Sequence, residues 1–240
     1  MAQDCQGITV HAVNFDYRGG PVFYASLPSD GETFKGCKAT GAGAKNHLVS
    51  MLLDHVAALE NPLWKCRHSF DRVAFPVHVV HGPLGRPQLL LGYRMPTISF
   101  SEGGGKVWAA LCGDASDIGI DVATTDEFQG EYPLHRVFHD RELQQVLKLT
   151  GGDLEKASAL LWSIKEAVVK ALGCAFHLVA PRQVHVYPSI GGDGGHIFPV
   201  CLSKKALVRS PTGAGRSIWV RSFPQAKMWL SIALLSRQSR

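Results

Sequence analysis

The spacing of hydrophobic residues predicts two long helices, one in each half of the chain. Within residues 41–62 the residues at helical spacing are Leu48, Met51, Leu52 and Val56. The Asn61-Pro62 pair ends this pattern, because proline cannot continue a helix. Over 153–172 the core-facing stripe consists of Leu161, Ile164, Val168 and Leu172. Asp153 is the expected N-cap of this second helix, and Gly173 is the expected residue after its C-cap.

Shorter alternating segments predict strands around both helices. One such segment, 8–14, precedes the first long helix, and four more, 72–80, 97–100, 106–112 and 118–122, lie between the two long helices. In the second half a further helix is predicted at 136–148, and strands are predicted at 183–187, 196–201, 217–222 and 227–235. The "GGDGG" segment at 191–195 is the expected hairpin turn.

The order of these elements, a helix followed by strands, occurs twice. This order predicts an α+β fold of two halves, each with one long helix and several strands. The expected division lies near 113–117, which gives halves of 1–113 and 114–240. The residues themselves show no repeat of identity, so the similarity rests on element order alone.

Composition is that of a folded, soluble protein. The chain has 240 residues, of which 45% are hydrophobic and 19% charged, enough for one large domain or two of about 100–150 residues. No apolar run approaches the ~18–20 residues of a membrane helix. The N-terminal stretch has no basic start followed by an apolar run, so we expect no secretory signal and a cytoplasmic location.

The net charge and the cysteine content narrow the class of protein only slightly. The formal net charge is +5, a mild bias toward anionic partners such as phosphates, acidic proteins or nucleic acid. Basic residues are not concentrated in one stripe, which argues against a nucleic-acid-binding module. The six cysteines are scattered and form no CxxC, so reduced thiols are expected rather than disulfides or a zinc site.

Several short motifs carry no clear chemistry. "GAGAKN" at 41–46 lacks the third glycine of a dinucleotide loop, and "GGDGG" lacks the lysine and hydroxyl of a phosphate-binding loop. Both are expected to be flexible turns. His78 and His81, three residues apart in a strand-like segment, would face opposite sides, which favours a structural role over metal binding.

Two segments do indicate a site. In "DIGIDVATT", 117–125, Asp121 is a carboxylate inside a short apolar strand, and it shares a face with Gly119. A buried carboxylate needs a cation, a metal or several hydrogen-bond donors, although a salt bridge or turn cap is the simpler alternative. On the second long helix, Trp162, Glu166 and Lys170 follow at intervals of four residues on a face away from the core, where a surface Glu–Lys pair is the alternative.

Taken together, the two segments predict a metal site. One carboxylate from a strand and one from a helix form the two-carboxylate arrangement that Mg²⁺ favours, with its remaining ligands drawn from water and a diphosphate. Lys165 and Lys170 would supply positive charge for phosphoryl oxygens.

At these residues the sequence resembles the 4′-phosphopantetheinyl transferases. The paired family signature is (I/V)G(I/V)D followed some forty residues later by (W/F)(S/C)xKE(A/S)xxK. Here these are Ile118-Gly119-Ile120-Asp121 and the segment from Trp162 to Lys170, in the family's order and at its separation. The length resembles the larger, Sfp-type members, in which two similar halves form a pseudo-dimer within one chain. The resemblance therefore implies two similar α/β halves, each a long helix packed on a small antiparallel sheet, with the active site at their interface.

The resemblance is weaker upstream and implies further binding residues. Gly85-Arg86-Pro87 matches the family's G(K/R)P, and "TISFS" at 97–101 takes the place of (N/F)(I/L)SHS. The residues implied to contact coenzyme A are Lys38, Lys45, Arg86, Ser99, Phe100, Lys165 and Lys170. Phe100 stands where the family usually has a histidine that touches the nucleotide. Ala123 stands where several bacterial relatives have a glutamate that completes the metal site.

The resemblance implies a specific group-transfer reaction. The family moves the 4′-phosphopantetheine arm of coenzyme A onto a serine of an acyl or peptidyl carrier protein and releases 3′,5′-ADP. Asp121 and Glu166 would hold Mg²⁺, with Mn²⁺ as a possible substitute; Glu166 would act as base and Lys170 would hold the transferred phosphate. The acidic helix of the carrier would dock near 138–149 or 123–135.

One chain should be sufficient to form the active site, so a monomer is expected, with neither nucleic acid nor membrane as a partner. The rival interpretation is a non-catalytic relative that binds the carrier or coenzyme A, which Phe100 favours.

Overall fold

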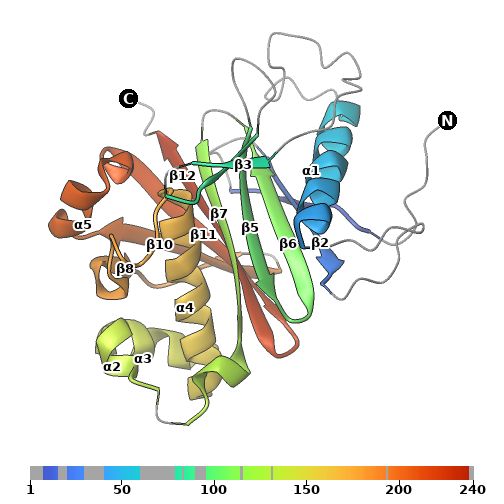
Figure 1. The fold of residues 1–240 in the computed structure, drawn as a ribbon. Helices are drawn as coiled ribbons and strands as arrows, with labels where there is room; N and C mark the ends of the chain where they lie inside the picture. The colour runs from blue at the N-terminus through green and yellow to red at the C-terminus, as the bar shows by residue number, and fades with distance from the viewer. Residues whose placement is uncertain are drawn as a thin grey trace.

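Two antiparallel sheets form the centre of the protein, and each carries one long helix (Figure 1). The computed structural model describes residues 8–15, 21–29, 41–59, 79–82, 84–89, 96–113, 116–130, 132–192 and 194–237. Within these ranges the α+β class predicted from the sequence is confirmed. The arrangement agrees with two similar halves, while their equivalence as a pseudo-dimer stays a prediction.

The first sheet has the strand order β1-β2-β6-β5. Its strands are β1 (His11–Val13), β2 (Val22–Pro28), β6 (Lys106–Cys112) and β5 (Thr97–Gly103). Helix α1 (Gly41–Ala58) packs on one face of this sheet through three residues of the predicted stripe, Leu48, Leu52 and Val56. The fourth, Met51, is only partly buried, and Val49 is buried in the same cluster. A separate two-stranded sheet joins β3 (Val79–His81) to β4 (Pro87–Leu89).

The second sheet has the order β7-β12-β11-β10-β8, and β9 also pairs with β10. Its strands are β7 (Ser116–Thr124), β12 (Met228–Arg237), β11 (Arg216–Gln225), β10 (Gly195–Leu202), β8 (Val184–Val186) and β9 (Ile190–Gly192). The helices of this part are α2 (Leu134–Val137), α3 (Asp140–Leu149), α4 (Leu154–Ala171) and α5 (Lys204–Arg209). Sheet membership thus changes between β6 and β7, at the division expected from the sequence. Whether 1–113 and 114–240 are separate domains stays a prediction.

Most expected elements are present, with two corrections. The helix expected at 136–148 is two helices, because the chain leaves helical geometry at Phe138 and restarts after the N-cap His139. The "GAGAKN" segment, expected as a turn, forms the start of α1. "GGDGG" does connect two paired strands, with Gly192 opposite Gly195. The predicted strand segment 72–78, which contains His78, lies outside the described residues.

Within the described ranges, the buried apolar side chains form three clusters that hold the layers together. One lies between α1 and the first sheet, and one between α4 and the second sheet. The third contains residues of both sheets, such as Trp108, Ile120 and Ile232, and so joins the two halves directly. The described cysteines, Cys112, Cys174 and Cys201, are free thiols, as expected for those three.

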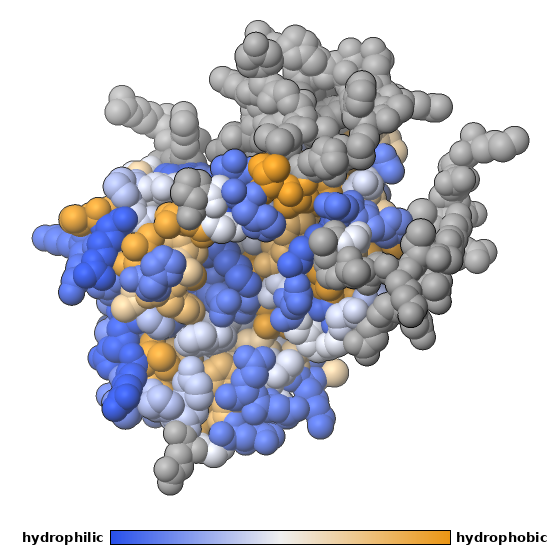
Figure 2. Space-filling view, viewed as in Figure 1, coloured by the Kyte–Doolittle hydropathy of each residue, from blue (hydrophilic) through white to orange (hydrophobic). Residues whose placement is uncertain are grey.

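The surface shows no single apolar face in the view of Figure 2, where hydrophilic and hydrophobic residues are interspersed among the described residues. No helix in the described ranges combines the length and apolarity of a membrane span.

Helix α4 lies directly against strand β7 because Gly119 has no side chain. A Cβ built at Gly119 would lie 1.9 Å from the carbonyl oxygen of Ala167 and 2.6 Å from the amide nitrogen of Ala171. Both atoms belong to the helix backbone, which cannot move aside as a flexible side chain can. The glycine of the strand motif therefore sets how closely the helix carrying Glu166 approaches the strand carrying Asp121.

We expect Gly119→Ala to destabilise the protein by about 1–3 kcal/mol or more, since overpacking at a rigid contact forces backbone shifts. The shift would also move Glu166 and Lys170 away from Asp121. Urea unfolding measures the first effect. Gly105→Ala is a suitable comparison, because no atom of the described residues lies within 4 Å of the Cβ position at Gly105, although its φ of +70° adds some backbone strain. A Gly119→Ala variant as stable as the parent would show that the close contact is not needed.

Candidate active site

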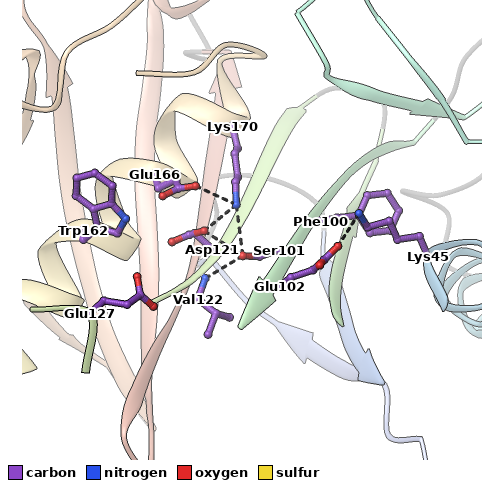
Figure 3. Close-up of a pocket in the computed structure, with 10 residues that line it drawn as sticks. All are labelled: Lys45, Phe100, Ser101, Glu102, Asp121, Val122, Glu127, Trp162, Glu166 and Lys170. Carbon is purple, nitrogen blue, oxygen red and sulfur yellow. Dashed lines mark hydrogen bonds and ion pairs between the residues drawn. The ribbon is translucent and has the colours of Figure 1, made fainter. Parts of the chain in front are cut away.

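A cleft of about 360 Å³ opens where β5 of the first sheet lies beside β7 of the second (Figure 3). Side chains from α1, β5, β7, the 3-10 turn Thr125–Phe128 and α4 line it. Trp162, Glu166 and Lys170 all reach this cleft, as their four-residue spacing predicted. Trp162 packs against aromatic rings, including Phe176 at a centroid distance of 4.9 Å, in agreement with a packing role.

Asp121 lies at the base of the cleft and is only 3% exposed. Its Oδ1 accepts hydrogen bonds from Lys170 Nζ at 2.7 Å and from Ser101 Oγ at 3.0 Å. Its Oδ2 is buried without a hydrogen-bond partner among the described residues. A buried carboxylate oxygen without a donor is costly, and such an atom is suited to bind a cation.

Burial raises the pKa of Asp121 to about 6, although the Lys170 ammonium lowers it; the nearby Glu166 carboxylate adds to the rise. The protein thus holds this carboxylate in an environment that disfavours its ionised form until positive charge is added. Perturbed acidic groups in a cleft are typical of functional sites.

This shift predicts that the contribution of Asp121 to the stability of the metal-free protein falls as pH rises. The folded-state pKa of Asp121 is above the unfolded value of about 3.9. The stabilisation that comes from protonated Asp121 is therefore fully present below about pH 4 and is lost as pH rises through about 6. Asp121→Asn removes the free-energy cost of burying an ionised carboxylate, so we expect this variant to melt at a higher temperature than the parent in EDTA near pH 7.5, with a smaller difference near pH 4.5. Thermal melts at both pH values test this. A variant less stable than the parent at the higher pH would contradict it.

Glu166 projects from α4 into the same cleft, and its side chain is 31% exposed. Its Oε1 lies 3.5 Å from Lys170 Nζ, so the lysine sits between the two carboxylates. The site therefore combines two carboxylates of different accessibility, one buried and one open to solvent. Carboxylate oxygens are the donors that Mg²⁺ or Mn²⁺ accepts, and the unpartnered Oδ2 of Asp121 fits such an ion.

A second cleft of about 210 Å³ adjoins the first and shares Lys45, Phe100 and Lys170 with it. Ser99 and Arg86 also line this second cleft, which brings together five of the residues expected to contact coenzyme A. Lys45 Nζ pairs with Glu102 at 2.8 Å and lies 5.9 Å from the centre of the Phe100 ring. The cations here suit a phosphorylated ligand.

Arg86 is held in place by Asp117, the residue that begins the "DIGID" motif. Both Arg86 and Arg216 pair with the Asp117 carboxylate. Burial opposes ionisation of Asp117, but the hydrogen bonds from Arg216 and Arg86 outweigh it and lower its pKa. Asp117 is therefore an anchor that places a cation of the first half against the second half.

Lys165 corrects one expectation from the sequence. Its side chain is 0% exposed and points away from both clefts: its Nζ pairs with Glu142 of α3 at 2.9 Å and donates to the carbonyls of Pro181 and Val184. The prediction that Lys165 contacts coenzyme A phosphates is wrong, because its ammonium group is buried and its hydrogen bonds are made within the fold.

The surroundings of Glu142 contain a second group of metal-type ligands, His139, Glu142 and His185. Glu142 also accepts from the backbone amides of His139 and Val186. Its carboxylate is thus already satisfied by Lys165 and two amides. Positive charge from Lys165 opposes binding of a metal ion there.

The structure also identifies cleft residues that sequence reasoning missed, and it leaves one prediction unplaced. Ser101, Glu102 and Glu127 all line the first cleft. Side chains alternate along β5, so Ser101 lies on the same side of the strand as Ser99. This alternation could have identified Ser101 from the sequence as a residue near the site. Lys38 lies outside the described residues, so its expected contact with coenzyme A stays a prediction.

Comparison with known proteins agrees with this site. Residues 117–195 match the family model described as the 4′-phosphopantetheinyl transferase superfamily. The matched segment includes Asp117, Asp121, Glu166 and Lys170. A search of curated proteins found no match to the chain. Residues 117–195 therefore form a domain of the 4′-phosphopantetheinyl transferase superfamily, whose members are transferases that use coenzyme A and, in general, a divalent metal.

Proposed function

We propose that this protein transfers 4′-phosphopantetheine from coenzyme A to a serine hydroxyl of an acyl or peptidyl carrier protein. The observation that carries the proposal is the placement of Asp121, Glu166 and Lys170 around one cleft within the segment that matches the superfamily. The adjoining cleft, lined by Lys45 and Arg86, supports a diphosphate-bearing co-substrate. Placement in the larger, Sfp-type subgroup, which the chain length favours, is part of the proposal.

In the proposed reaction the serine oxygen attacks the phosphorus that bears the pantetheine arm. A new O–P bond forms, the bond from that phosphorus to the bridging oxygen of the pyrophosphate breaks, and 3′,5′-ADP leaves. The serine proton passes to Glu166, the more accessible carboxylate of the pair and therefore the one able to meet an incoming hydroxyl. Most of the catalysis in such a transfer comes from positioning and charge neutralisation.

The remaining roles belong to the cations and to Asp121. Asp121 and Glu166 would hold Mg²⁺ or Mn²⁺, which when bound neutralises charge on the pyrophosphate. Lys170, which lies between the carboxylates, would bind a phosphoryl oxygen of the transferred group. Lys45 and Arg86 line the neighbouring cleft and would bind the phosphates of the nucleotide portion.

Two positions depart from the family pattern. Ala123 faces α4 from β7 and supplies no carboxylate, so water would complete the metal's ligands there. Phe100 lines both clefts, with the Lys45 ammonium over its ring. It offers the nucleotide an apolar surface in place of a histidine. This substitution is also the feature that favours the alternative, a non-catalytic protein that binds coenzyme A or a carrier.

Release of 3′,5′-ADP tests the proposal against this alternative. The protein is incubated with coenzyme A, Mg²⁺ and each of several apo carriers, and nucleotide products are separated by chromatography. The matched control is a carrier whose acceptor serine is replaced by alanine. We expect 3′,5′-ADP only with an intact acceptor. Calorimetric binding of coenzyme A with no release for any carrier would favour the non-catalytic alternative.

The partner is an apo carrier protein with an acidic recognition helix, in keeping with the net charge of +5. The candidate docking surface comprises the segments 138–149 and 123–135; from the second, Glu127 lines the same cleft as Glu166. We further propose that one chain is sufficient, since both sheets contribute to the cleft within a single protomer.

A further inference from the structure

The two sheets meet at the site through serine side chains. Strands β5 and β7 lie side by side but belong to different sheets, so the outer edge of β7 has no backbone ladder there. Instead, the amide of Ile120 donates to Ser99 Oγ at 3.1 Å, and the amide of Val122 donates to Ser101 Oγ at 3.2 Å. Two hydroxyls of the first half thus satisfy backbone donors of the second.

Ser101 differs from Ser99 because its hydroxyl also forms hydrogen bonds with Lys170 and Asp121. Its oxygen accepts from the Val122 amide and lies 3.3 Å from Lys170 Nζ, which also donates to it. A serine hydroxyl has two lone pairs and one proton. With both lone pairs facing donors, the proton is directed to the remaining partner, Asp121 Oδ1, at 3.0 Å (Figure 3).

This arrangement makes the two oxygens of Asp121 unequal. Oδ1 accepts one hydrogen bond from Ser101 and another from Lys170, while Oδ2 is buried and accepts none from the residues that the structure describes. A carboxylate held by hydrogen bonds at one oxygen cannot rotate freely, so the other oxygen keeps a fixed direction. Partners of this kind orient a metal ligand before the ion arrives.

We propose that Ser101 is a positioning residue for the cation site: its hydroxyl fixes Asp121 through Oδ1 and reserves Oδ2 for the metal ion. The site is then assembled from both halves of the chain, because the ligand comes from β7 and the group that orients it comes from β5. This inference rests on the cation-binding part of the proposed function and not on transfer to a carrier.

The chain supplies a matched control in Ser99. Ser99→Ala and Ser101→Ala each remove one hydroxyl from the same strand and one hydrogen bond to a β7 amide. Only Ser101→Ala also removes a contact with Asp121. Any effect of weakening the contact between the strands is therefore common to both variants, and an effect on the metal ligand belongs to Ser101 alone.

Binding of Mn²⁺ alone, followed by the loss of the free-ion signal in electron paramagnetic resonance, tests the inference without any carrier. Asp121→Asn provides the reference for a lost site, and melts in EDTA report the folding of each variant. We expect Ser101→Ala to bind Mn²⁺ about 10–100-fold more weakly than the parent, the usual cost of removing a group that orients a ligand. Ser99→Ala should stay within about threefold of the parent.

The proposal is overturned if Ser101→Ala binds Mn²⁺ as the parent does, if Ser99→Ala is weakened equally, or if the parent binds no Mn²⁺. If Ser101→Ala does not fold, Ser101→Cys keeps the side-chain size with a weaker donor and takes its place in the comparison. Failure of the proposed transfer would be recognised separately, as Mn²⁺ binding that is lost in Asp121→Asn without release of 3′,5′-ADP.

Discussion

Glu166→Gln is expected to reduce kcat/KM for phosphopantetheine transfer by about 10³-fold or more, equivalent to about 4 kcal/mol of transition-state stabilisation. Glutamine has nearly the same shape as glutamate but cannot accept the serine proton, and it is a poor ligand for Mg²⁺. Glu166 is also the more accessible member of the carboxylate pair, with its side chain 31% exposed, so the change should leave the fold intact. The measurement is a steady-state rate of holo-carrier formation at saturating Mg²⁺.

A control on the same helix separates this effect from a general loss of negative charge. Glu155 lies in the first turn of α4, at the opposite end from Lys170. We expect Glu155→Gln to retain the parent's rate within about twofold, as for a surface change away from the site. Coenzyme A binding should persist in Glu166→Gln, since Lys45 and Arg86 are unchanged. A Glu166→Gln variant with more than about a tenth of the parent's activity would show that Glu166 is not the base.

Lys165→Met is expected to lower the free energy of unfolding by about 3–5 kcal/mol, because it leaves a buried carboxylate without its counter-charge. Glu142 would lose its ion pair, and the carbonyls of Pro181 and Val184 would lose a donor. Burial already lowers the pKa of Lys165, and the Glu142 carboxylate opposes that shift. Urea unfolding monitored by tryptophan fluorescence measures the loss.

The double variant Lys165→Met with Glu142→Gln should recover part of this loss, since neither buried charge then remains. Coenzyme A affinity of the folded fraction should stay close to that of the parent. The opposite pattern, unchanged stability with a large loss of coenzyme A affinity, would return Lys165 to the role that the sequence first suggested for it.

The sequence predicted those parts of the site whose geometry follows from the regular repeat of a helix or a strand. Trp162, Glu166 and Lys170 meet the cleft because four-residue steps stay on one helix face. Asp121 faces α4 because strand residues alternate, and Gly119 on the same face admits the helix. These two short-range regularities were enough to bring together a carboxylate pair whose members lie 45 positions apart, as the numbers 121 and 166 show.

Long-range partners could not be predicted in the same way. Lys165 is one residue from Glu166, but one step along a helix rotates about 100°, which turns it toward α3 and Glu142. Nothing in the local pattern identifies that partner. Strand β2 was missed because its residues, from Val22 to Leu27, are buried or nearly buried on both faces and therefore lack alternation. The role of Ser101 depends on β5 lying beside β7, which no sequence period reveals.

The most direct test of the central claim, that Asp121 and Glu166 form the metal-dependent centre of a phosphopantetheinyl transferase, is the intact mass of an apo carrier after incubation. The protein, coenzyme A and Mg²⁺ are mixed with carriers of the fatty-acid, polyketide and nonribosomal-peptide types, and Asp121→Asn and Glu166→Gln are run in parallel. We expect a gain of one phosphopantetheine group on at least one carrier, abolished by EDTA and in both variants. A gain that survives in both variants, or no gain on any carrier despite bound coenzyme A, would contradict it.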